Sequence, residues 1–208
     1  MLRSFCVLLL LLSVVLTASP LAVVPKWRIE RNVEETPTSV QNDPEIDRSP
    51  IWAMVFGRYL YHLGREMFWP ELDQRARFQI GVVRWGALAE DLGSQLEGRA
   101  IAGLPVEIIP LTAAELRDHR GDFTMLFLGD TNAQTGRKEI EESLQRWNKK
   151  QDKKALIITD GAQLPACDLV FRRRGEGQDI GLCLIQQLKN LENKGMVLPA
   201  PFLQRLCP

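Results

Sequence analysis

The chain has 208 residues, with 26 basic and 26 acidic side chains, so its formal net charge at pH 7 is zero. A balanced charge gives no electrostatic footprint for nucleic acid as a main partner. Hydrophobic residues make up 45% of the chain and charged residues 25%. This composition is that of an ordinary globular protein, and it excludes a fibrous or wholly disordered one.

Residues 1–22 have the three parts of a secretory signal peptide. Arg3 gives a positive start, Val7–Leu16 is almost wholly apolar, and small residues follow. The apolar run is shorter than the roughly 20 residues that a helix needs to cross a bilayer. We therefore expect export and cleavage after Ala18 or Ala22; an uncleaved anchor is the alternative.

The mature chain is expected to begin with an extended leader, residues 23–49, because this stretch is rich in turn formers and poor in apolar residues. The ordered domain is expected over residues 50–208. Ser49–Pro50 predicts the start of a helix. Apolar residues then recur at three- and four-residue steps over Trp52–Met67, and Phe68–Pro70 ends the helix.

Short apolar runs then alternate with amphipathic stretches. The runs predict buried strands and lie at Phe78–Val83, Val106–Ile109, Met125–Leu128 and Ala155–Thr159. The amphipathic stretches predict helices and lie at residues 88–96, 113–117 and 138–149, with Thr112 as a helix cap. Strands separated by helices predict an α/β fold, a mainly parallel sheet with helices on both faces.

The pattern changes after Gly161. Two strand-like runs, Asp168–Phe171 and Asp179–Leu182, flank the glycines of Arg174–Gly177 and predict a β-hairpin. A helix over Leu184–Leu191 and a short apolar piece complete the chain.

Of the four cysteines, Cys6 lies in the signal peptide, which leaves Cys167, Cys183 and Cys207. In an oxidising compartment these tend to pair. A hairpin centred on Gly175 places Cys167 opposite Cys183, with Cβ atoms about 4.5–5.5 Å apart, close to disulfide geometry. We therefore expect a Cys167–Cys183 disulfide; pairing of Cys183 with Cys207 is the alternative. A structural role is favoured over redox catalysis because no C-x-x-C motif occurs.

Arg172, Arg173 and Arg174 form a basic run beside the hairpin. The run is either a solvated strand end or a contact for an anionic partner protein, ligand or membrane surface. Trp69 is expected in the core, with a partner-binding or dimer face as the alternative.

No arrangement of residues points to a catalytic, cofactor-binding or metal-binding site. His62 lies in the long helix and His119 in a polar loop, and the sequence pairs neither with a nucleophile. No metal-ligand spacing such as H-E-x-x-H occurs. Gly129–Arg137 lacks the Lys–Ser/Thr ending of a phosphate loop. The alternative is a small secreted α/β hydrolase or ligand-binding enzyme, in which Ser94 or Thr131 works with a histidine base.

The predicted helices and strands, in their order along the chain, resemble those of the YfiR-like family of small exported bacterial proteins. The resemblance extends over residues 50–208. Its carrying features are Phe68–Pro70, Phe78–Val83, Leu96–Ile108, Met125–Leu128, Ile158–Gly161 and the terminal region Leu182–Leu206. The chain departs from the family at Cys167–Arg174, which replaces a glycine-rich strand, and at Pro199–Leu203, which replaces a small-residue leucine helix.

The resemblance implies a non-enzymatic periplasmic regulator that uses no cofactor and forms a homodimer. In the best-known member, such a protein binds the periplasmic part of an inner-membrane diguanylate cyclase and restrains it, and an outer-membrane lipoprotein can sequester the regulator. We therefore expect a regulator of an inner-membrane signalling protein in cyclic di-GMP signalling. An accessory subunit for a transporter or for adhesion machinery is an alternative that the sequence does not separate from it.

Overall fold

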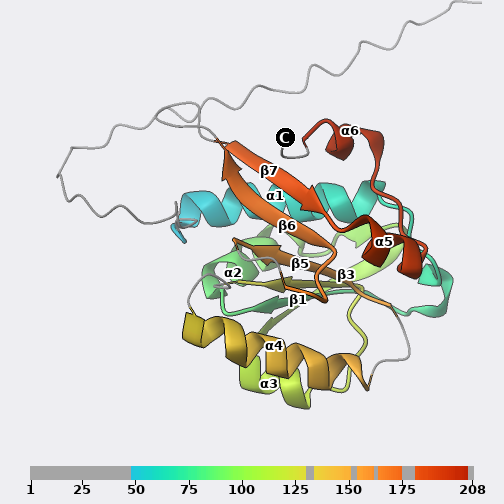
Figure 1. Cartoon of the computed structure of the whole chain (residues 1–208). Helices are drawn as coiled ribbons and strands as arrows, with labels where there is room; N and C mark the ends of the chain where they lie inside the picture. The colour runs from blue at the N-terminus through green and yellow to red at the C-terminus, as the bar shows by residue number, and fades with distance from the viewer. Residues whose placement is uncertain (1–47, 130–133, 151–153, 162–163, 175–180, 206–208) are drawn as a thin grey trace, which may run out of the picture.

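The computed structural model describes residues 48–129, 134–150, 154–161, 164–174 and 181–205 (Figure 1). The strands are β1 (Phe78–Val83), β2 (Ala100–Ile101), β3 (Leu104–Leu111), β4 (Met125–Leu128), β5 (Leu156–Asp160), β6 (Leu169–Arg174) and β7 (Gly181–Gln186). The helices are α1 (Pro50–Glu66), α2 (Gly86–Leu96), α3 (Ala113–Asp118), α4 (Gln134–Asn148), α5 (Leu188–Lys194) and α6 (Ala200–Leu203), with the 3-10 helix η1 (Leu72–Gln74) after α1.

In the described part of the chain the strands form one sheet, in the order β2-β3-β1-β4-β5-β6-β7. The five inner strands β3, β1, β4, β5 and β6 run parallel to one another. β2 and β7 pair antiparallel at the two edges. This confirms the predicted α/β fold and its C-terminal hairpin. β1 comes first in the chain but lies between β3 and β4, so the strand order reverses beside β1, as it does in doubly wound sheets.

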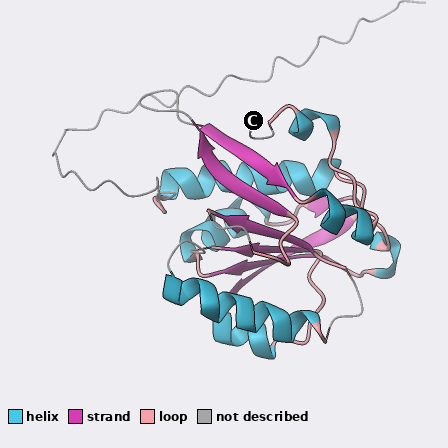
Figure 2. Cartoon of the chain, viewed as in Figure 1, coloured by secondary structure: helices cyan, strands magenta, loops and turns pink. Residues whose placement is uncertain are grey.

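Helices cover both faces of the sheet, α1 and α2 on one face and α3 and α4 on the other (Figures 1 and 2). On the first face Phe56 of α1 packs edge-on against Phe127 and Phe171, with ring centroids 5.6 and 4.9 Å apart. On the second face Trp147 of α4 shares a core with Leu126. Neighbouring residues of a strand point to opposite faces of the sheet. Since helices cover both faces, residues on either face must be apolar, and the central strands are continuous apolar runs.

Local sequence chemistry sets several element bounds. β1 and β4 have the predicted bounds, and α1 starts after Ser49 with proline in its first turn. At the start of α3, Thr112 Oγ1 accepts from the Glu115 N–H at 3.1 Å, and Glu115 Oε2 accepts from the Thr112 N–H at 2.7 Å. Hydrogen bonds from the backbone N–H and the side chain of Thr112 lower the pKa of the Glu115 carboxyl group. The cap predicted at Thr112 is therefore a full capping box.

The C-terminal pattern corrects two expectations. The sequence predicted a strand over Asp179–Leu182 and a helix over Leu184–Leu191, but β7 continues through Leu184 and α5 begins only at Leu188. Leu184 stays in the strand because its side chain is buried and its N–H donates to the carbonyl oxygen of Arg205 at 2.9 Å. A backbone partner distant in sequence has overridden the local helical spacing.

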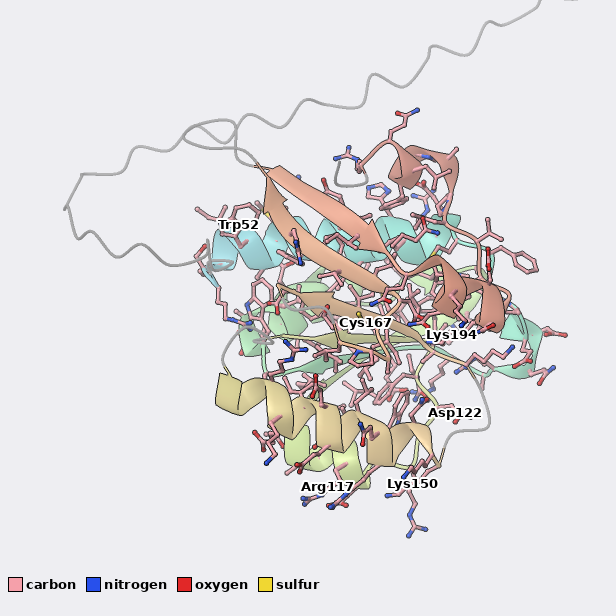
Figure 3. All side chains as sticks on the ribbon, viewed as in Figure 1. Trp52, Arg117, Asp122, Lys150, Cys167 and Lys194 are labelled. Carbon is pink, nitrogen blue, oxygen red and sulfur yellow. The ribbon has the colours of Figure 1, made fainter. Side chains whose placement is uncertain are left out.

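Lys194, labelled in Figure 3, ties the end of α5 to the residues directly before β5 and β6. Its Nζ donates to Asp168 Oδ2 at 2.6 Å and to the carbonyl oxygen of Ala155 at 2.7 Å. The Ile157 N–H donates to the same carboxylate oxygen at 2.6 Å. Burial raises the pKa of the Asp168 carboxyl group, and the charge of Lys194 opposes that shift.

None of the helices in the described ranges is long and apolar enough to cross a membrane. The predicted signal peptide and leader up to residue 47 lie outside the described residues.

We expect Lys194→Met to destabilise the fold by about 3 kcal/mol, because it leaves the buried Asp168 carboxyl group without its cation. Urea unfolding followed by circular dichroism measures this loss. Lys189→Met is the matched control, since Lys189 is exposed on the same helix. Equal free energies of unfolding for the two variants would contradict a stabilising role of the Lys194 contact.

Candidate functional site

The carboxyl ends of β1, β3, β4 and β5 meet at one edge of the sheet, because these strands are parallel neighbours. After β1 the chain enters α2 on one face, and after β4 it enters α4 on the other. Ligands of doubly wound sheets bind between two such strands, since the connections diverge there. This edge is therefore the candidate functional site.

The side chain of Arg48 lies at this edge, although residue 48 precedes the first helix. Its Nη2 donates to Asp160 Oδ2 at 2.8 Å, and its Nη1 donates to the carbonyl oxygen of Arg84 at 3.3 Å. Its guanidinium carbon lies 5.2 Å from the centre of the Trp85 ring. The Asp160 side chain is only 3% exposed and that of Arg48 is 30% exposed. A carboxylate, a carbonyl and an aromatic face thus surround one planar cation.

Gly129, directly after β4, makes room for the guanidinium group. A Cβ at this position would lie 2.7 Å from Arg48 Nη1 and 3.1 Å from the carbonyl oxygen of Val83. The Gly129 backbone cannot simply retreat, because its N–H donates to the same Val83 oxygen at 3.0 Å. Any larger residue would displace Arg48.

Arg84 links the ends of β1 and β3 to α4. Its φ is 61°, a left-handed conformation that is uncommon outside glycine. Its N–H donates to the carbonyl oxygen of Leu111 at the end of β3, at 3.0 Å. Its Nη1 lies 3.3 Å from Glu139 Oε2 on α4. Contacts with β3 and α4 therefore hold the turn at Arg84 in place. Its carbonyl oxygen is left to accept the hydrogen bond from Arg48.

Trp85 belongs both to the site and to the core. It is 3% exposed, and its ring packs edge-on against Phe56 with centroids 5.1 Å apart. It also contacts Phe127 at 5.8 Å. The aromatic wall of the site is thus held by core packing, so its position does not depend on Arg48.

Of the predicted partner-binding arginines, Arg172 is exposed on β6. It lies one residue beyond the pair formed by Asp160 and Phe171, so β6 extends past the end of β5 at the same edge. Arg173 and Arg174 continue the strand, but their side chains lie outside the described residues.

Trp69, the other predicted partner contact, is a core residue. Its side chain is buried, its Nε1 donates to the carbonyl oxygen of Gly64 at 2.7 Å, and its ring packs edge-on against Phe78. It therefore offers little surface to a partner. Its neighbour Phe68 is 65% exposed and forms an isolated antiparallel bridge with Val197, which is 63% exposed.

The register predicted for the cysteines is wrong. The hairpin pairs Arg172 with Cys183, whereas Cys167 lies before β6, where Gln187 donates to its Sγ at 3.4 Å. Gln187 lies four residue steps beyond Cys183, on the order of 13 Å along an extended chain, which exceeds the reach of a disulfide. The hairpin was centred on the wrong residue because its β7 arm starts later than expected. Cys167 is buried and unbridged, and Cys207 lies outside the described residues.

The two histidines lie in unrelated surroundings. His62 Nδ1 is 3.3 Å from Glu66 Oε1, and both side chains are exposed on α1. His119 follows α3 and stacks on Phe123 with centroids 4.5 Å apart, and burial lowers its pKa. In the described contacts neither histidine meets Ser94, and Thr131 lies outside the described residues.

Within the described ranges, no group of three or more histidine, cysteine or acidic side chains comes together to hold a metal ion. No family model matches this chain, and no curated protein matches it. The resemblance to the YfiR-like family thus stays a prediction, and the candidate site rests on its geometry.

The sequence did not indicate Arg48 or Asp160 as site residues. The one available indication was that Asp160 directly follows the predicted strand Ala155–Thr159. The carboxyl ends of parallel strands often carry functional side chains. Nothing near Arg48 in sequence connects it to a carboxylate 112 positions away.

We expect the Cys167 thiol to resist alkylation in the folded protein and to react fully after unfolding, because it is buried and burial raises its pKa. Alkylation of the unreduced protein before and after denaturation, followed by peptide mass mapping, measures this. A peptide pair linked through Cys167 and Cys183 would contradict the register of the hairpin.

Proposed function

We propose that this chain is an exported, non-enzymatic binding protein. It restrains an inner-membrane signalling protein, such as a diguanylate cyclase, by binding its periplasmic domain. The proposal is supported by the resemblance of residues 50–208 to the YfiR-like family, and by Arg172, which is exposed where β6 extends past the end of β5. A homodimer, and sequestration by an outer-membrane lipoprotein, belong to the same proposal.

The observation that carries the proposal is the position of β6. Arg172 is exposed at a point where β6 has passed the end of its parallel neighbour β5. Two more arginines, Arg173 and Arg174, follow it in the strand. Positive charge on a projecting strand attracts an acidic surface from a distance and orients it on approach.

A second surface of different chemistry lies at the other end of the parallel strands. Phe68 and Val197 are held side by side by their bridge, and the adjacent Trp69 packs on Phe78, the first residue of β1. Large apolar side chains exposed together in this way favour contact with another protein surface. We assign this pair to the contact with a second copy of the chain, which leaves the basic edge to the receptor.

Restraint by such a protein needs no reacting groups. It requires only that the regulator bind one state of the receptor more tightly than the other. A tenfold difference in affinity corresponds to about 1.4 kcal/mol, which a few charged contacts at an interface edge can supply.

We expect the triple charge reversal Arg172→Glu, Arg173→Glu and Arg174→Glu to weaken binding to the purified periplasmic domain of the cyclase by at least about tenfold. Biolayer interferometry at two salt concentrations measures the affinity. Wild-type binding should weaken with salt, because exposed charges are screened. In cells, the variant should raise cyclic di-GMP.

The matched control is Arg99→Glu, which reverses one exposed charge away from β6. It should leave affinity unchanged. Sedimentation equilibrium and thermal melting check that both variants keep the oligomeric state and the fold. Unchanged affinity of the triple variant would contradict the proposal.

A further inference from the structure

The surroundings of Arg48 form a receptor that the rest of the domain builds without it. Asp160 ends β5, Trp85 follows β1 and is fixed by core packing, and Gly129 follows β4. The Arg84 carbonyl comes from a backbone turn that is held by Leu111. We call Asp160, Trp85, Gly129 and the Arg84 carbonyl the guanidinium site.

The chemistry of the site selects a planar cation. Asp160 provides a carboxylate that is nearly inaccessible to water, with its side chain 3% exposed, so a cation there meets little screening. The face of Trp85 attracts a guanidinium group by cation–π interaction and by stacking. The glycine backbone at position 129 leaves a space that any Cβ would fill.

Arg48 reaches this site from a position at the margin of the domain. Only Ser49 separates it from Pro50, where α1 begins, and the carbonyl oxygen of Ser49 accepts the first described helical hydrogen bond, from Ala53 at 3.0 Å. The arginine therefore occupies the site without being part of a helix or strand. Withdrawal of Arg48 requires no strand or helix of the fold to move.

We propose that the guanidinium site is a binding site for an arginine side chain, that Arg48 occupies it in cis, and that an arginine from another molecule exchanges with Arg48. The ligand class is an alkylguanidinium, presented by an arginine on the surface of a partner protein. Exchange releases the Arg48 side chain from the sheet edge, so that binding at this edge is coupled to the position of Arg48. This inference is independent of the regulatory role proposed above.

The arginine in cis competes strongly with an added ligand. A group tethered by a short chain acts at an effective concentration in the millimolar range or above. Wild-type protein should therefore bind added guanidinium ligands weakly, whereas a protein that lacks the Arg48 side chain should bind them readily. This difference makes the site testable with a small molecule.

The test is a titration of the protein purified from the periplasm with agmatine, an alkylguanidinium, followed by thermal melting and by isothermal calorimetry. We expect Arg48→Ala to melt at a lower temperature than wild type, and millimolar agmatine to restore the lost stability in a saturable manner. Putrescine, which keeps the terminal amine of agmatine and has an ammonium in place of the guanidinium group, should bind about tenfold more weakly. The wild type should show no shift at the same agmatine concentrations.

The double variant Arg48→Ala, Asp160→Asn is the matched control, because it removes the carboxylate and keeps the shape of the side chain. It should not respond to agmatine. The proposal is overturned if agmatine leaves Arg48→Ala unchanged, or if it stabilises the single and the double variants equally. If Arg48→Ala does not fold alone, the same titration asks whether agmatine restores its folded circular dichroism, and failure to do so also overturns the proposal.

Discussion

Asp160 is a carboxylate that the fold buries at the end of a central strand, and a buried carboxylate needs a compensating cation. The cation is supplied by Arg48, from the segment just before the first helix. This ion pair closes the carboxyl edge of the sheet, at the position where doubly wound folds place their ligands. The need to compensate the Asp160 charge explains why Arg48 occupies this edge. It also explains why only another cation can take the place of Arg48.

The two ends of the parallel strands use their cations differently. At the amino ends, cations donate to backbone carbonyl groups and hold segments together. Lys194 bonds to Ala155 as well as to Asp168, and Arg75 donates to the carbonyl oxygens of Asp122 and Lys154. At the carboxyl ends, Arg48 and Arg84 are partly exposed and lie beside the carboxylates of Asp160 and Glu139, and Arg172 is exposed, so an incoming group can compete for them. The cations of the amino edge are therefore structural, and those of the carboxyl edge are suited to recognition.

The sequence predicted the parts of the fold that depend on local chemistry. Phe78–Val83 and Met125–Leu128 had the right bounds because strands covered on both faces are apolar throughout. Thr112 was recognised as a cap because capping residues act within one turn. The continuation of β7 through Leu184 was missed because Leu184 is kept in the strand by Arg205, a partner that no local pattern indicates. The Arg48–Asp160 contact was missed for the same reason, since it joins a predicted linker to the end of a distant strand.

The account depends most directly on the coupling between these two side chains, which a double-mutant cycle measures. The cycle compares urea unfolding of wild type, Arg48→Met, Asp160→Asn and the double variant. If Asp160 relies on Arg48, the two substitutions are non-additive, with a coupling free energy of about 2 kcal/mol. Additivity within about 0.5 kcal/mol would show that Asp160 does not need Arg48, and would contradict the guanidinium site at the sheet edge.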